Sequence, residues 1–268
     1  MASPSTPATP RPAATIMLLR EGAQGLEVLM VVRHHQIDFA SGALVFPGGK
    51  LAKGDHDACL PGCCTGTEGL SPEQIALRVG AIREAFEESG ILLARSRGAA
   101  ALLDANRVTV LGTRYRKRLD AGEIGMADML EAEDLVLTCE ALVPFAHWIT
   151  PDILPKRFDT HFYLAAAPAE QRAVHDGKEM VDSEWVRPND ALAQAAAGAR
   201  TLVPATRLNL QKLARNSNLA GAMQAARTQR IVTVSPKTIV RPTGRVLEIP
   251  AEADYGITEF AIPEDELR

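Results

Sequence analysis

The sequence predicts an α/β fold, and three observations lead to this prediction. Two β-prone apolar segments, residues 15–19 and 26–32, flank a short Glu-Gly-Ala-Gln-Gly turn and predict a hairpin. Apolar residues then recur at helical spacing within residues 72–89. The rest of the chain carries further β-prone stretches followed by helical ones: 142–149, 158–166, 191–197, 202–213 and 219–226. We expect these helices to pack on the sheet that the strands form.

Length and composition fit one large domain, or one domain with an extension. The chain has 268 residues, of which 46% are hydrophobic and 23% charged, enough to bury a sizeable core. No apolar run approaches the ~20 residues that cross a bilayer, so we expect no membrane partner. The formal net charge of −4 and the pI of about 5.9 argue against a broad nucleic-acid-binding face, which is usually basic. A local arginine cluster would still suffice to hold a diphosphate.

The first residues differ in composition from the rest of the chain. Residues 1–12 consist of Ala, Ser, Thr and Pro around Arg11 after the initial Met, which predicts a disordered tail. They contain no apolar core followed by a cleavage-like pattern, and the final Asp-Glu-Leu-Arg is not a peroxisomal Ser-Lys-Leu address. We therefore expect a cytoplasmic protein.

The helix predicted over residues 72–89 has clear start and stop signals. Ser71 suits the N-cap, Pro72 the first helical position, and Gln74 the partner in a capping box. Gly90 suits the C-terminal stop. One stripe of the helix carries the apolar side chains that would face the core, and the opposite side carries three glutamates. The stripe comprises Ile75, Val79, Ile82 and Phe86.

Those glutamates, Glu84, Glu87 and Glu88, lie at helical spacing and repel one another. Each like-charged pair costs a few tenths of a kcal/mol on an isolated helix. A divalent cation would reverse the sign of this interaction, and a ligand set made only of oxygen atoms suits Mg²⁺ or Mn²⁺. The competing interpretation is a solvated helix face, because glutamate is a good helix former.

The segment 44–51, Leu-Val-Phe-Pro-Gly-Gly-Lys-Leu, supports the metal interpretation. An apolar strand here breaks into a proline-glycine turn. Gly48 and Gly49 lack a Cβ, so their backbone can come close to a metal or a phosphate group. A strand, this turn and the Arg-Glu-x-x-Glu-Glu-x-Gly helix together resemble the Nudix box of the Nudix hydrolases.

The match to the Nudix box is complete in its second half and interrupted in its first. Gly49 fits the first glycine of the family pattern, and Asp55 stands where the family has Glu. Between Asp55 and Arg83 lie 27 residues, where the family has 7. We expect the excess, about residues 56–70, to be an irregular insertion before the helix, which would leave its metal-binding face intact.

A box split at this point resembles the subgroup that includes the peroxisomal coenzyme A diphosphatase. The segments His-Trp-Ile-Thr-Pro at 147–151 and Arg-Phe-Asp-Thr-His-Phe at 157–162 resemble that subgroup too. The likeness covers about residues 13–215. It implies a Nudix-type α/β/α sandwich around a mixed β-sheet over residues 13–190. Residues 191–268 would form a C-terminal helical extension and tail packed on the same domain.

The resemblance also implies roles for individual residues. Glu84, Glu87 and Glu88 would bind Mg²⁺ or Mn²⁺, with one of them as the general base, and the pattern leaves open which one. Gly48 or Gly49 would offer a backbone carbonyl, and Arg83 would orient the glutamates. Glu179, in a Gly-Lys-Glu segment before Glu-Trp, would approach the metal from a loop, although an exposed loop glutamate explains it equally well. Arg33 and Gly49 are candidates for binding the substrate.

The implied reaction is metal-dependent hydrolysis of a nucleoside diphosphate joined to another group. Coenzyme A or acyl-coenzyme A is the first candidate, giving 3′,5′-ADP and (acyl-)4′-phosphopantetheine. The usual coenzyme A signature before Phe-Pro-Gly-Gly is not matched after Arg33, so ADP-ribose, NADH and other nucleotide diphosphates stay open. A Nudix ligand sensor without turnover is a further alternative.

Three features of the sequence have no settled role. Cys59, Cys63 and Cys64 lie close together, but they lack the separated pairs typical of zinc sites, which favours a reduced, partly buried loop. The basic run at 114–118 is either solvated surface or a phosphate contact. The last 40 residues turn β-prone, and an edge strand, a homodimer contact and a substrate cover all fit them.

Overall fold

The computed structural model describes residues 7–33, 42–57, 60–175, 180–242 and 244–261. Its centre is an eight-stranded mixed sheet in the order β10-β2-β1-β9-β8-β11, with β3 joined to β2 and β4 joined to β1. The strands are β1 (Arg11–Gly22), β2 (Gly25–Arg33), β3 (Leu44–Val45), β4 (Gly48–Lys50), β8 (Val143–Ile149), β9 (Phe158–Ala166), β10 (Met180–Val186) and β11 (Thr233–Val234).

The predicted hairpin is present, as β1 and β2 pair from Leu19 and Val28 to the turn. β1 also runs parallel to β9, and β8 runs parallel to β11, whereas the other pairs are antiparallel. The sheet is therefore mixed, as expected.

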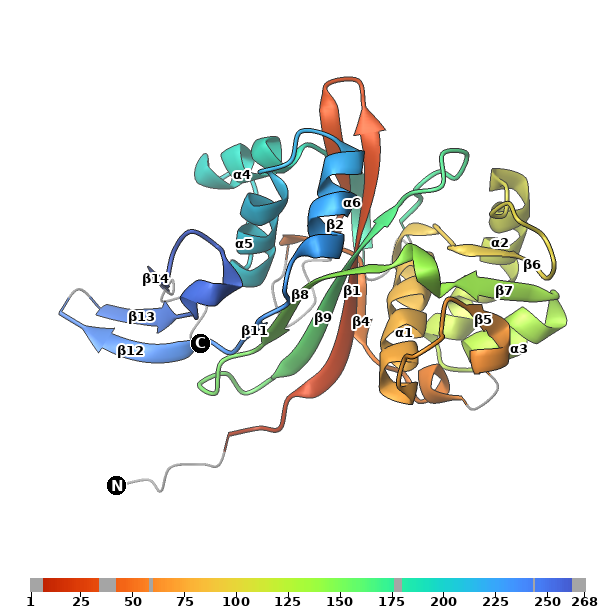
Figure 1. The fold of residues 1–268 in the computed structure, drawn as a ribbon, viewed down its shortest axis with the longest axis horizontal. Helices are drawn as coiled ribbons and strands as arrows, with labels where there is room; N and C mark the ends of the chain where they lie inside the picture. The colour runs from red at the N-terminus through yellow and green to blue at the C-terminus, as the bar shows by residue number, and fades with distance from the viewer. Residues whose placement is uncertain (1–6, 34–41, 58–59, 176–179, 243, 262–268) are drawn as a thin grey trace.

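Helices cover both faces of this sheet, which confirms the α/β/α sandwich (Figure 1). Ile16 and Leu18 of β1 point into one core cluster, and Met17 and Leu19 into the other. This alternation follows from the two-residue period of a strand. The first cluster packs under α1 (Pro72–Ser89), α2 (Ala105–Asp120) and α3 (Met126–Ala132), and the second under α4 (Pro188–Ala196), α5 (Pro204–Leu213) and α6 (Leu219–Thr228).

The insertion in the box is more regular than predicted. η1 (Lys53–His56) precedes it, and the insertion itself contributes η2 (Leu60–Cys63) and β5 (Cys64–Thr65). β5 pairs with β7 (Leu135–Thr138), which also pairs with β6 (Ala94–Ser96). β5 forms a strand because the chain that completes this small sheet comes from some seventy residues further on.

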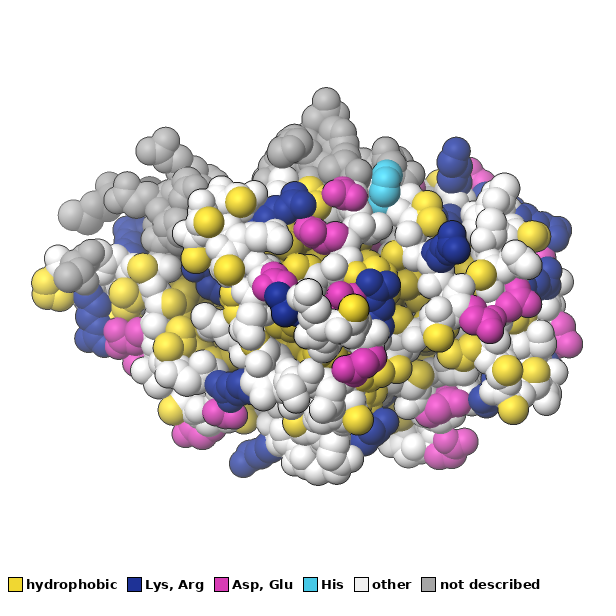
Figure 2. Space-filling model, turned by 90° about the horizontal axis from the view of Figure 1, so that it is seen from above, with side chains coloured by type: hydrophobic (Ala, Val, Ile, Leu, Met, Phe, Trp, Pro, Cys, Tyr) yellow, Lys and Arg dark blue, Asp and Glu magenta, His cyan; other side chains and the backbone are white. Residues whose placement is uncertain are grey.

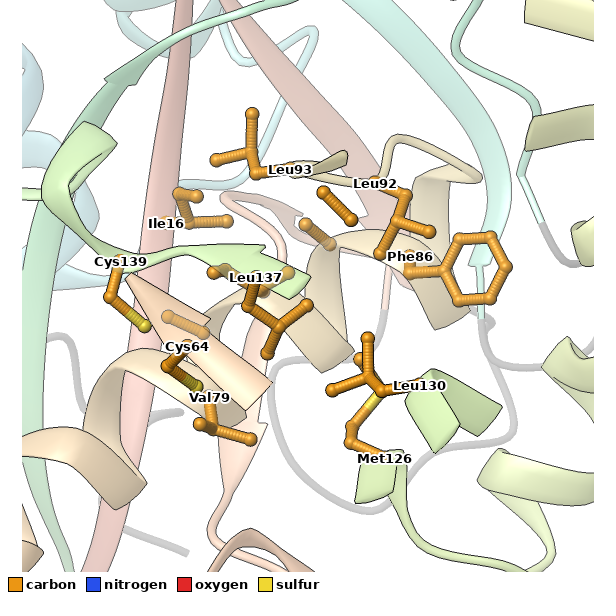
Figure 3. Packing of buried hydrophobic residues seen from close by; sticks show 14 of the residues in the cluster. Ile16, Cys64, Val79, Phe86, Leu92, Leu93, Met126, Leu130, Leu137 and Cys139 are labelled. Carbon is orange, nitrogen blue, oxygen red and sulfur yellow. The ribbon is translucent and has the colours of Figure 1, made fainter. Parts of the chain in front are cut away.

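Two cysteines of the insertion, Cys63 and Cys64, lie in the core. Cys63, Cys64 and Cys139 are free and buried; Cys139 belongs to η3 (Cys139–Ala141). Figure 3 shows Cys64 and Cys139 near Val79 and Leu137, within the first core cluster. Burial and the neighbouring Cys139 thiol raise the pKa of the Cys64 thiol, with the hydrogen bond to Cys139 as the largest cause. Cys59 lies outside the described residues.

Near both ends of the described chain, the structure differs from the predicted division into tail, domain and helical extension. β1 begins at Arg11, so residues 11 and 12 belong to the sheet and not to a tail, since their backbone pairs with Phe158 and Asp159 of β9. The C-terminal extension is not only helical. Beyond α6 it forms η4 (Ala251–Ala253) and a separate three-stranded sheet of β12 (Lys237–Arg241), β13 (Gly244–Glu248) and β14 (Glu259–Ala261).

Within the described residues, none of the helices combines the length and the apolar character needed to span a membrane. On the face drawn in Figure 2, acidic and basic side chains are interspersed, and no broad basic surface is visible there.

Candidate active site

Helix α1 forms over the predicted residues, with the predicted ends. Ser71 and Gln74 make a capping box: the Gln74 N–H donates to Ser71 Oγ at 3.3 Å, and the Ser71 N–H donates to Gln74 Oε1 at 2.9 Å. Gly90 ends the helix in the left-handed region, at φ 72°, where glycine is favoured. These caps fix the helix at both ends, and its buried stripe packs on β1 and β4.

The proline-glycine turn lies against the glutamates of this helix. The Gly48 N–H donates to Glu88 Oε2 at 2.9 Å. A Cβ on Gly49 would lie 2.6 Å from Glu84 Oε1, too close for any other residue without a shift. Both glycines are held by pairing of β4 with β1 at Ala14 and Thr15. The sequence-predicted turn and helix therefore meet, although they are more than thirty residues apart.

Arg83 is the centre of a buried network of charges. Its guanidinium donates to both carboxylate oxygens of Asp55, at 2.9 and 3.0 Å, and to Glu87 Oε2 at 2.8 Å. It also lies 2.9 Å from Glu84 Oε1 and donates to the Lys50 carbonyl at 3.1 Å. Asp55, from the short helix η1, thus reaches Arg83 despite being a methylene shorter than the family's Glu. Arg83 therefore contacts two of the three glutamates, Glu84 and Glu87.

Burial and charge act in opposite directions within this network. The pKa of Glu87 is raised to about 8, mainly by burial and also by the charge of Glu84, while the charge of Arg83 opposes the rise. For Arg83, burial would lower the pKa, but the charges of Glu84, Asp55 and Glu87 outweigh it and the net pKa is raised. Glu87 Oε1 is buried and has no hydrogen-bond partner. A buried carboxylate oxygen in this position is incompletely satisfied by the protein alone.

These residues fit a divalent metal ion. The donor set consists of oxygen atoms from Glu84, Glu87 and Glu88, and includes the unpartnered Glu87 Oε1, which suits a hard cation. Glycine at position 49 keeps the space beside Glu84 free of a side chain. A cation would also stabilise the charged form of Glu87 against its burial.

Two of the sequence-predicted site residues are not fully described. Glu179 lies outside the described residues. For Arg33 only the backbone is described, and it ends β2 opposite Met180 of β10. The other predicted site residues come together near the C-terminal end of α1: Glu84, Glu87, Glu88, Arg83, Gly48 and Gly49.

The basic run at 114–118 lies on α2 and is largely occupied within the protein. Arg114 binds Glu133 Oε1 at 2.8 Å, and Arg118 lies 3.8 Å from Glu123. Arg116 donates to the carbonyl oxygens of Glu87, at 2.7 and 3.1 Å, and of Val174. These contacts favour a structural role, and they anchor α2 to the end of the helix that carries the glutamates.

One cluster was missed by the sequence reasoning. In the part of the chain that the structure describes, one group of three potential metal ligands has its donor atoms within 4.8 Å of one another: His147, Asp159 and His161. Asp-Thr-His at 159–161 places two of these side chains on one face of a strand. That spacing was the available signal, but its pairing with His147 depends on the register of β8 and β9.

Known proteins similar to this chain include two diphosphatases. The acyl-coenzyme A diphosphatase NUDT19 of Xenopus laevis is 25% identical over 204 residues, which cover 62% of this chain and 54% of that protein. The Homo sapiens protein of the same name is 25% identical over 239 residues, covering 74% of this chain and 63% of that protein. The chain thus spans between 54% and 63% of the length of these two relatives.

A solved structure and a family model point the same way. The crystal structure of a NUDIX hydrolase from Alicyclobacillus acidocaldarius is 28% identical, with a TM-score of 0.66, and covers 81% of this chain and 96% of that chain. The family model described as the NUDT19 Nudix domain matches residues 65–213. That match takes in α1 with its glutamates and the strands β8, β9 and β10, and it begins after the proline-glycine turn. The chain belongs to the Nudix family, in the group represented by the NUDT19 Nudix domain.

Proposed function

We propose that this protein hydrolyses a nucleoside diphosphate linked to another group, in a reaction that depends on Mg²⁺ or Mn²⁺. The observation that carries the proposal is the meeting of the two halves of the split box. Gly48 binds Glu88, Gly49 lies against Glu84, and Arg83 joins Asp55 to Glu84 and Glu87. A solvated surface helix, the competing interpretation, would not bury Arg83, Glu87 and Glu88.

In the proposed mechanism, Glu84, Glu87 and Glu88 would hold the divalent ion. When bound, such an ion offsets charge on the diphosphate and makes water a better nucleophile at neutral pH. Arg83 would keep Glu84 and Glu87 in position, since its own position is fixed by Asp55. We propose that one of these three glutamates is the general base, acting directly or through a water molecule.

We propose coenzyme A or acyl-coenzyme A as the substrate, cleaved to 3′,5′-ADP and (acyl-)4′-phosphopantetheine. Two relatives found here are named acyl-coenzyme A diphosphatase, and the interrupted box resembles their subgroup. ADP-ribose and NADH share the diphosphate that the site would act on, so they belong in the same assay.

The test is turnover by the purified full-length chain with Mg²⁺ or Mn²⁺, using coenzyme A, acetyl-coenzyme A, ADP-ribose and NADH in parallel. We expect release of 3′,5′-ADP from coenzyme A, and a loss of at least about 100-fold in Glu88→Gln. Glu73→Gln is the matched control, because Glu73 is an exposed glutamate in the first turn of the same helix. Equal activity of the two variants would remove the glutamate site from the mechanism.

Other outcomes would replace parts of this proposal. Preferential cleavage of ADP-ribose or NADH would keep the mechanism and change the substrate. Binding of one of the four compounds with no turnover of any would identify a ligand sensor. A cytoplasmic location and a homodimer stay predictions, to be checked by localising the protein in its own cells and by light scattering of the purified chain.

A further inference from the structure

A histidine pair lies on the sheet outside the glutamate site. The rings of His147 on β8 and His161 on β9 are stacked, with centroids 4.0 Å apart and planes inclined by 18°. Asp159 accepts a hydrogen bond from His147 Nε2, and its same Oδ1 lies 4.0 Å from His161 Nε2. All three side chains are partly exposed. One carboxylate oxygen thus stands between two imidazole nitrogens, within reach of solvent.

We propose that His147, Asp159 and His161 bind a single transition-metal ion of the Zn²⁺ class. Two imidazoles and one carboxylate form a donor set typical of Zn²⁺ and chemically similar ions, whereas Mg²⁺ prefers oxygen atoms alone. This site would therefore select a different metal from the glutamates of α1. It does not depend on the proposed hydrolysis, and it adds a second metal to the molecule.

The backbone holds the three ligands without help from the metal. His147 and His161 are directly opposite each other in the antiparallel pair of β8 and β9. Asp159 lies two residues before His161 on the same strand, so both side chains project from the same face. A rigid sheet is a better platform for a metal site than a loop, because it keeps the ligands in register before binding.

The other nitrogen of His147 already has a partner. Thr233 Oγ1 on β11 lies 2.8 Å from His147 Nδ1, at the register position directly beside His147. When Nε2 binds a metal, Nδ1 carries the ring proton and would donate it to this hydroxyl. Such outer contacts fix the orientation of a ligating imidazole.

The charge state of His161 also suits a ligand. Burial, followed by the neighbouring His147, lowers the pKa of His161 to about 4. Near neutral pH the imidazole is therefore uncharged and has a lone pair to offer. Tyr163, two residues further along β9, lies in the core cluster under α1, so His161 and Asp159 project from the α1 face of the sheet.

Metal binding requires a small rearrangement that can be observed. A metal lies in the plane of each imidazole that binds it, so the two rings must turn out of their stacked arrangement. Ligand atoms around a tetrahedral ion at ~2.0 Å are roughly 3.3 Å apart, so the 4.0 Å between His161 Nε2 and Asp159 Oδ1 must shorten. Three protein ligands then leave a fourth position for water.

The cluster shares a row of the sheet with the glutamate site. Gly49 pairs with Ala14, Ala14 with His161, His161 with His147, and His147 with Thr233. Directly opposed residues project from the same face. Strands lie ~4.8 Å apart, so the Cα atom of His161 is about 10 Å from that of Gly49 along this row. The second metal would therefore lie beside the first site and not within it.

The test is a titration of the metal-stripped full-length protein with Co²⁺, in excess Mg²⁺ that occupies the glutamate site. We expect one equivalent of Co²⁺ to bind with the intense visible absorption of four-coordinate cobalt, and Zn²⁺ to displace it and remove the absorption. His161→Gln and Asp159→Asn should each weaken binding by at least tenfold. Thr233→Val should weaken it by about 10- to 100-fold, as loss of an outer contact does.

Two controls make the result decisive. His175→Gln replaces an exposed histidine outside the cluster and should bind Co²⁺ like the wild type, while circular dichroism checks that every variant folds. Absence of the visible absorption in the wild type, or its retention in folded His161→Gln, overturns the inference. The readout is not hydrolysis, so the two proposals can fail separately. If the protein cleaves its substrate but shows no cobalt absorption, only the second metal site is contradicted. A protein with the absorption and no turnover contradicts only the proposed function.

Discussion

At the scale of single residues, Gly49 shows how closely the turn and the helix are fitted. A Cβ at this position would lie 2.6 Å from Glu84 Oε1 and 2.8 Å from Glu84 Cδ, while Glu84 is also held by Arg83. Gly49→Ala should therefore displace the Glu84 carboxylate and leave the fold intact. We expect turnover to fall by about 10- to 100-fold, because small misplacements of catalytic groups are costly.

Gly62→Ala is the matched control for that substitution. A Cβ at Gly62 meets no atom within 4 Å, so the same change of residue adds a methyl group in open space. Steady-state kinetics of both variants would separate the effect of crowding Glu84 from the general effect of losing a glycine. If Gly49→Ala were as active as Gly62→Ala, the position of Glu84 would not matter for turnover.

Glu87 predicts how the stability of the metal-free protein depends on pH. Its pKa is raised by burial from the ordinary 4.5 to about 8. Between these values the folded state keeps a proton that the unfolded state has lost, so stability falls as pH rises. The loss is on the order of a few kcal/mol across this range.

Urea unfolding at several pH values in the presence of a chelator would measure this slope. In Glu87→Gln the neutral amide replaces the titrating acid, so the decline between about pH 4.5 and about pH 8 should flatten. Saturating Mg²⁺ should flatten it in the wild type as well, since a bound cation favours the charged carboxylate. A wild type with the same slope as Glu87→Gln would show that burial does not control this carboxyl.

At the scale of elements, the predictions that succeeded rest on local signals. Residues 72–89 were expected as a helix from the cap residues and the stop glycine, and α1 has those bounds. Most strands and the helices after Pro188 also lie close to their predicted ranges, because their hydrophobic patterns are local signals too. The candidate site residues also come from two short motifs, one with Gly48 and Gly49 and one with the three glutamates, and the spacing is fixed only within each motif.

What the sequence did not reveal depends on pairing between distant segments. β5 lies in the insertion and becomes a strand because β7 runs beside it, and residues 11 and 12 join β1 because β9 does. The His147 cluster is of the same kind, since it arises from the register of two strands. Neither composition nor periodicity within one segment carries this information.

The start of α1 offers a test of local stabilisation. In Ser71→Ala the side chain no longer accepts the Gln74 N–H, and the capping box is broken. We expect a loss of about 1 kcal/mol in the free energy of unfolding, measured by chemical denaturation. Turnover in the folded variant should be unaffected, because the glutamates lie at the opposite end of the helix. Thr67→Ala is the control. Thr67 is less exposed than Ser71 but lies in the loop before the helix, so the loss of its hydroxyl should change stability far less.

At the scale of the whole molecule, the two faces of the sheet serve different purposes. The α1 face carries the glutamates and the histidine cluster, and the opposite face is packed by α4, α5, α6 and the C-terminal segment. Tyr255 ties that segment to the sheet. Its hydroxyl accepts a hydrogen bond from Trp148 Nε1 at 2.8 Å and donates one to Asn209 Oδ1 at 2.7 Å. All three side chains are buried.

Tyr255→Phe should therefore lower stability without changing catalysis. The substitution keeps the ring but leaves the Trp148 N–H and Asn209 Oδ1 buried without this partner, and such unsatisfied groups cost about 1–3 kcal/mol each. Asn209 Nδ2 already lacks a partner, so the site has little means of compensation. Denaturation followed by tryptophan fluorescence would measure the loss, and kcat/KM of the folded variant should match the wild type. A drop in kcat/KM with unchanged stability would instead mean that the C-terminal segment acts on the active site across the sheet.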